Sequence, residues 1–275
     1  MEEKEKTTSS IQIEERKRKK EKRELFLISA VSVAVFLGIW ELAVRMEWLD
    51  PQFVCSPSEA FLAFVDKLTN ADPDGAVLGA HILESLKLAL IGYVAAVIVG
   101  VPLGLLLGYY RTFDRLVTPI FEIIRPIPPI AWIPLSVIWL GIGTTAKCFI
   151  IFLAAFVPCV INSYTGVKLT NPVLIDVAKT CGASRWTIFR TVCTPSAMPL
   201  AFTGVRVALG NAWSTLVAAE MLSATAGLGY MIQQGRALGR SDIIIVGMLT
   251  IGVIGAVLTG ILNRMENKVI RWRAR

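Results

Sequence analysis

Long apolar runs alternate with short polar segments along most of the chain. Residues 88–110, 148–167 and 243–263 hold no charged side chain, and about 20 apolar residues in a helix are enough to cross the hydrocarbon core of a membrane. Three further runs of similar length are interrupted only by a few charges or prolines. The pattern therefore predicts an all-α integral membrane protein whose six spans cover residues 25–44, 86–110, 116–141, 146–167, 198–221 and 243–263.

Composition agrees with this class, and the basic residues give the predicted spans a direction. The chain is 54% hydrophobic and 18% charged, whereas soluble domains carry about 25% charged residues. Twenty Lys and Arg residues lie in the arm 1–24, in the segments after the second and fourth spans, and in the tail 264–275, but only five lie in the alternate loops. Because basic residues concentrate in cytoplasmic segments, we expect both termini in the cytoplasm and a single membrane domain over residues 25–263.

The same count explains the net charge of +7 as a consequence of topology, so a nucleic-acid partner is not expected. The chain also offers little for covalent chemistry. Its five cysteines form no C-x-x-C pair, and its single histidine, His81, has no Cys, Asp or Glu at the spacing of a metal site or catalytic triad. Gly141 and Gly143 precede Lys147, but the P-loop pattern that binds nucleotide phosphates is absent. We expect no enzyme activity, metal site or cofactor in this chain.

One amphipathic segment is expected outside the spans, between the first and the second. Ser58 can cap a short helix that ends near Asp66. Apolar side chains would then lie on one side of that helix, which is typical of a helix lying on the membrane surface; they are Phe61, Leu62, Phe64 and Val65.

The polar segment 168–195 separates two predicted spans on the cytoplasmic side. Asn171 and Pro172 are typical of a helix start, and Gly182 is placed to end that helix in a left-handed conformation. Ser184 can cap a second helix, which Pro195 would break or kink before the next span. The segment is therefore predicted to be a helix–turn–helix hairpin. Small residues at its turn would let a partner approach the backbone closely.

The spacing within this hairpin resembles the EAA signature of ATP-binding-cassette importer permeases, in which EAA, three residues, Gly, nine residues and I-x-L-P follow one another. Ala178, Gly182 and Pro195 match that signature, whereas Val177 and Thr194 depart from it. Two other stretches, RPIPPIAWIP with WLGIG and WSTLVAAE with GLG, resemble permeases of taurine, aliphatic sulfonate and nitrate importers, the taurine permeases above all.

This resemblance implies the six-helix transmembrane domain of a type I importer, located in the cell membrane. It implies a homodimer, two ATPase subunits that bind ATP and Mg²⁺, an extracytoplasmic solute-binding protein, and a small anion as substrate. The first helix of the hairpin would be the coupling helix that docks on the ATPase subunit. The residues implied in coupling are Asp176, Val177, Ala178, Lys179, Gly182, Ala183 and Ser184.

Two sets of residues are candidates for a translocation pathway. Arg206, Trp213 and Glu220 are spaced by seven, which places them on one stripe of a helix with Ser214 beside it, and charges within a span are costly unless they have a function. The alternative is that Arg206 reaches the cytoplasmic edge and Glu220 ends the span.

The second set is Arg125, Trp132 and Trp139, with the same spacing in the proline-rich span. Prolines leave backbone groups that need a neighbouring helix or a water-lined cavity, so this span is expected to line the pathway or its gate.

Two other functions remain open. An ion-gradient secondary transporter would need acidic residues or histidine in the middle of its spans, and these are almost absent. A membrane anchor without transport activity would need neither a proline-broken span nor a docking hairpin.

Overall fold

The computed structural model describes residues 2–48, 50, 53–223 and 225–269. Regular structure in these residues is entirely helical, and no strand occurs among them. The elements are α1 (Glu2–Arg45), α2 (Pro57–Lys67), α3 (Leu78–Tyr109), α4 (Arg111–Ile124), η1 (Pro129–Trp132), α5 (Ile133–Leu140), α6 (Thr144–Lys168), α7 (Pro172–Thr180), α8 (Arg185–Ile188), η2 (Phe189–Cys193), α9 (Thr194–Ser223), α10 (Leu228–Ala237) and α11 (Ser241–Val269).

Five segments of the described chain are long and apolar enough to cross a membrane by themselves. They are Leu27–Arg45, Leu78–Tyr109, Thr144–Lys168, Arg185–Met221 and Ser241–Glu266. The all-α, multi-pass fold class is therefore confirmed. The predicted arm 1–24 is helical from Glu2 onward and forms the first part of α1. Residues 270–275 of the predicted basic tail 264–275 lie outside the described part.

The proline-rich region 116–141 is not one straight span. It forms α4 followed by η1 and α5, and the two parts are bent by 85°. Pro126, Pro128 and Pro129 fall at the break, where the missing N–H groups and the restricted backbone end the first helix. The bent pair counts as a sixth span only if both parts are taken together.

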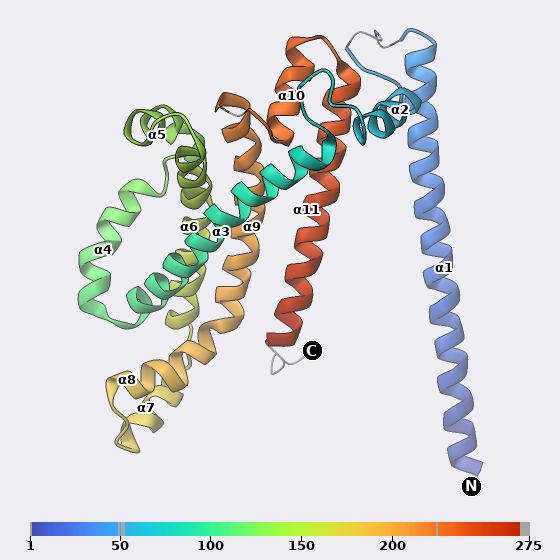
Figure 1. Ribbon diagram of the computed structural model, residues 1–275. Helices are drawn as coiled ribbons and strands as arrows, with labels where there is room; N and C mark the ends of the chain where they lie inside the picture. The colour runs from blue at the N-terminus through green and yellow to red at the C-terminus, as the bar shows by residue number, and fades with distance from the viewer. Residues whose placement is uncertain (1, 49, 51–52, 224, 270–275) are drawn as a thin grey trace.

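Helices α3, α6 and α9 form the centre of the molecule, with α10 and α11 packed beside them (Figure 1). Figure 1 shows α7 and α8 at one end of this bundle and α2 and α10 at the opposite end. Helix α1 lies apart from the bundle and is joined to α2 by the Ser58 hydroxyl, which donates to the Glu41 carboxylate over 2.8 Å. The cap of α2 is Ser56, two residues earlier than predicted, and it forms a capping box with Glu59.

The contact between α3 and α6 depends on glycines. A Cβ atom at Gly104 would lie 2.4 Å from the carbonyl oxygen of Val160, and one at Gly108 would lie 2.7 Å from Cβ of Val167. Gly92 and Gly100 are equally close to α6. Small residues let membrane helices approach to backbone contact, which replaces the hydrophobic driving force that lipid cannot supply.

Replacing Gly104 by leucine is therefore expected to destabilise the bundle by about 1–3 kcal/mol or more, because the obstacle is backbone, which cannot rotate away. The measurement is the fraction of monodisperse protein left after heating in detergent. Gly260→Leu on α11 is the matched control, since no atom lies within 4 Å of a Cβ built there. Equal melting of the two variants would contradict the role of Gly104.

Candidate functional site: the hairpin between α6 and α9

Helix α7 starts where the sequence predicts. Asn171 is its N-cap, and the side-chain oxygen of Asn171 accepts a hydrogen bond from the Val173 N–H over 2.9 Å. Pro172 occupies the first helical position, where its missing N–H costs nothing. The start of the helix is therefore defined by two adjacent residues.

The turn after α7 is a complete Schellman motif. Gly182 has φ +77°, its N–H donates to the Lys179 carbonyl over 2.9 Å, and the Ala183 N–H donates to the Ala178 carbonyl over 3.0 Å. A side chain at position 182 would be strained by the left-handed backbone. Ser184 then caps α8 by accepting from the Thr187 N–H. This geometry fixes the turn between α7 and α8.

At Pro195, between the hairpin and α9, the sequence predicts a break or a kink. The helix is not broken there, because α8, the π-helical turn η2 and α9 follow one another without a gap. Within η2 the backbone hydrogen bonds have already changed from the i−4 to the i−5 carbonyl. The Thr194 N–H and hydroxyl both donate to the Phe189 carbonyl, five residues earlier. Pro195 directly follows this π-helical turn, so its missing N–H falls where the hydrogen-bond pattern has already changed.

The hairpin has an inner and an outer side. Ala178, Ala183 and Ile175 pack against a buried cluster formed by Ile188, Phe189 and neighbouring apolar residues. Four large apolar residues of α7 and α8 are 51–63% exposed, although they belong to a largely polar segment; these are Val173, Leu174, Val177 and Trp186. We call this set the outer apolar surface.

The other coupling residues named from the sequence surround this surface. Asp176 and Lys179 are exposed and form an ion pair of 2.9 Å, and Gly182 and Ser184 are exposed at the turn. The seven residues thus belong to one small unit. Leu174 and Trp186 were not among the seven predicted residues. The sequence feature that could have identified Leu174 and Trp186 is a large apolar residue on the polar side of a capped helix.

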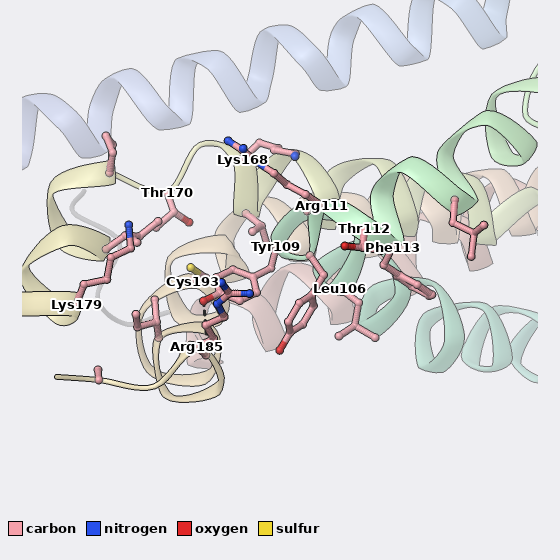
Figure 2. Close-up of a pocket in the computed structure, with 18 residues that line it drawn as sticks. Leu106, Tyr109, Arg111, Thr112, Phe113, Lys168, Thr170, Lys179, Arg185 and Cys193 are labelled. Atoms are coloured by element: carbon pink, nitrogen blue, oxygen red, sulfur yellow. Dashed lines mark hydrogen bonds between the residues drawn. The ribbon is translucent and has the colours of Figure 1, made fainter.

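A cavity lies on the inner side of the hairpin (Figure 2). It measures about 1210 Å³ and is bounded by α7, α8, the end of α6 and the corner between α3 and α4. Figure 2 shows Arg111, Lys168, Lys179 and Arg185 around it. Tyr109 closes one side, and its hydroxyl donates to the Arg185 carbonyl over 2.8 Å.

The proline-rich region carries a second, smaller cavity. It measures about 400 Å³ and is lined by Arg125 and Trp132, by apolar residues of α4 and α6, and by Asn211 of α9. The Trp132 and Trp139 ring centroids lie 6.5 Å apart despite the bend, and Arg125 pairs with Glu122 over 3.1 Å. The structure therefore brings this predicted set together.

The stripe on α9 lies differently from the prediction. Arg206 forms an ion pair with Glu266 of α11, and Trp213 is buried and donates its indole N–H to the Ile251 carbonyl over 3.0 Å. These residues share a face, and Trp213 and Glu220 are buried inside the protomer, whereas the Arg206 side chain is 41% exposed. Ser214 lies on the exposed face instead, together with Gly210 and Asn211.

Glu220 is fully buried at the α10 end of the molecule. The Ser85 hydroxyl of α3 donates to its carboxyl group over 2.7 Å, and the Gly229 N–H donates over 2.8 Å. A Cβ at Gly227 would lie 2.4 Å from this carboxyl group. Glu220 therefore holds the loop before α10 against α3, and it lies at the end of the segment Arg185–Met221, as the alternative predicts.

His81 belongs to the same polar region. The sequence spacing indicated an isolated histidine, but the structure brings distant polar groups next to it. Its Nδ1 accepts from the Gly227 N–H over 3.0 Å, and its Nε2 lies 3.2 Å from Asp74. Asp74 also pairs with the buried Lys67. The described residues contain no group of three or more His, Cys, Asp or Glu side chains that could hold a metal ion.

Comparison with known proteins gives this architecture a context. The family described as "Binding-protein-dependent transport system inner membrane component" matches residues 100–271. The chain is 36% identical to the taurine transport system permease protein TauC of Escherichia coli (strain K12), over 89% of both chains. It is 30% identical to the nitrate import permease protein NrtB of Leptolyngbya laminosa, over 88% of this chain and 87% of that protein. An inward-facing structure of the MetNI methionine ABC transporter superposes with a TM-score of 0.58 at 20% identity, over 72% of this chain and 96% of the other.

Proposed function

Because the chain belongs to the family of binding-protein-dependent transport system inner membrane components, we propose that it is the permease subunit of an ATP-driven importer. The observation that carries this proposal is the outer apolar surface on a hairpin whose start, turn and exit are all fixed by local hydrogen bonds. Exposed apolar residues on a rigid, otherwise polar unit are typical of a protein interface.

The proposed complex contains two copies of this chain, two ATPase subunits that bind ATP and Mg²⁺, and an external solute-binding protein. The outer apolar surface of each copy would dock on one ATPase subunit. The excess of basic residues in the hairpin and in both terminal segments favours a cytoplasmic location for all three.

We propose a small anion of the taurine, sulfonate or nitrate type as substrate, since the similar permeases carry taurine and nitrate in their names. Ser214, Gly210 and Asn211 are exposed on the central helix α9, and Asn211 also lines the cavity with Arg125 and Trp132. In a dimer these residues would line the pathway, with Trp139 beside it. Arg125 and backbone N–H groups suit an anion.

The proposed cycle is alternating access. ATP binding would draw the two hairpins together and open the pathway to the outside, and hydrolysis with product release would return it to the inside. The protein's own part in this cycle is to transmit the movement of α7 and α8 to the spans.

The test is ATPase activity of the purified, reconstituted complex. We expect hydrolysis to increase when the binding protein and its ligand are both added, and radiolabelled taurine, sulfonate or nitrate to accumulate only with ATP. A secondary transporter would accumulate substrate from an ion gradient without ATP, and a membrane anchor would accumulate none. Either result would overturn the proposal.

A further inference from the structure

The larger cavity, behind the hairpin, has features that import does not require. Its two sides differ in chemistry. Leu106 and Phe113 line the side of α3 and α4, whereas Lys179 and Arg185 lie on the side of the hairpin, and Arg111 lies between these sides near Lys168 (Figure 2). The cavity thus combines apolar residues of the spans with four basic residues.

Its positive charge is only partly balanced. Lys168 pairs with Asp114 over 3.1 Å, and Lys179 pairs with Asp176 over 2.9 Å. Arg111 and Arg185 have no carboxylate partner within the part of the chain that the structure describes, and none of the described lining residues is acidic. Two guanidinium groups, one from α4 and one from α8, are therefore available to an anion.

Thr170 adds a second, independent observation. It lines the cavity, is only 5% exposed, and its hydroxyl has no hydrogen-bond partner among the described residues. Leaving a buried polar group unpaired is unfavourable. A ligand oxygen in the cavity is an acceptor that would satisfy it.

We propose that this cavity binds the phosphate group of an anionic phospholipid. Guanidinium groups form short, charge-assisted and often bidentate hydrogen bonds with phosphate. Basic pockets between spans at the cytoplasmic surface are typical sites for such headgroups. The apolar side accepts the start of the acyl chains. Tyr109 and Tyr110 also line the cavity, and Tyr is enriched where a membrane meets water.

The lipid would also connect two elements. Arg111 begins α4, next to the corner with α3, and Arg185 begins α8 of the hairpin. One phosphate held by both would tie the hairpin to the spans, so anionic lipid would strengthen the connection between the ATPase and the pathway. This role goes beyond carrying substrate and does not depend on which anion is imported.

The test measures lipid binding directly, on the full-length permease purified with its partner subunits. Native mass spectrometry with phosphatidylglycerol is compared for wild type, Arg111→Gln, Arg185→Gln and the double variant. We expect roughly fivefold weaker binding for each arginine and about thirtyfold for both. Arg190→Gln is the matched control, because Arg190 is an exposed arginine of the same hairpin that does not line the cavity. Thr170→Val, which keeps the shape and removes the hydroxyl, is expected to weaken binding less than either arginine variant.

Two comparisons identify the ligand. Phosphatidylcholine, whose choline cation neutralises the phosphate charge, is expected to bind wild type more weakly than phosphatidylglycerol does and to lose less affinity in the double variant. Inorganic phosphate is expected not to displace the bound lipid at millimolar concentration. Equal loss of lipid from the Arg190→Gln and the double variant would overturn the site, and displacement by inorganic phosphate would assign it to a free anion instead. A size-exclusion profile in which the ATPase is still bound serves as the control that each variant is folded. Because the measurement is lipid binding, the result does not depend on import activity.

Discussion

Val177→Asp is expected to abolish the association of the permease with the proposed ATPase subunit. Val177 belongs to the outer apolar surface and is 56% exposed in the protomer. Loss of its apolar contact costs roughly 1 kcal/mol, and burying an unpaired carboxylate costs several kcal/mol more. Together these weaken docking by at least about 100-fold. The measurement is the amount of ATPase that copurifies with a tagged permease, followed by transport in vesicles.

The fold of the permease is expected to survive this change, because the side chain is exposed and its helix is capped from both ends. Val65→Asp on α2 is the control: it places the same charge on another half-exposed valine, at the opposite end of the molecule. Val177→Thr removes less apolar surface and adds no charge, so it should show an intermediate loss. If Val177→Asp retained normal amounts of ATPase, the proposed docking surface would be wrong.

Glu220→Ala is expected to be the most destabilising substitution in the spans. It removes the acceptor of the Ser85 hydroxyl and of the Gly229 N–H, both buried, and each unsatisfied group costs about 1–3 kcal/mol. It also leaves a cavity in a tightly packed region. The melting temperature in detergent should fall, and protease cleavage in the loop before α10 should increase.

Glu220→Gln distinguishes positioning from a role in transport. The amide keeps the shape and one oxygen acceptor, so the melting temperature should recover most of the loss. If Glu220 only positions the loop, transport should recover in parallel with stability. A stable but inactive Glu220→Gln variant would instead favour a direct role of the carboxyl group in the pathway.

The hairpin could be predicted closely because its signals are local. Asn171, Gly182 and Ser184 each bond to groups within five positions along the chain, so spacing alone is enough to place them. The spans could be predicted for a similar reason, since apolar length decides whether a helix can cross the membrane.

The partners of the buried polar residues could not be predicted in this way. The spacing of Arg206, Trp213 and Glu220 indicated correctly that they share a face, but nothing local shows what that face meets. Ser85, which bonds Glu220, is 135 positions away. The bend of 85° has the same origin: prolines show where a helix ends, whereas the direction of the next helix depends on distant packing.

The uninterrupted helical segment Arg185–Met221 has a mechanical consequence. Its 37 residues correspond to about 55 Å, so one helical segment reaches from the hairpin to the buried Glu220. A movement of α8 caused by the proposed ATPase partner would therefore be carried along this segment toward the loop before α10, and the helix can bend at the π-helical turn, at Pro195 and at Pro199. Inserting or deleting a residue within Phe189–Cys193 would rotate the far end relative to the near end by about 100°.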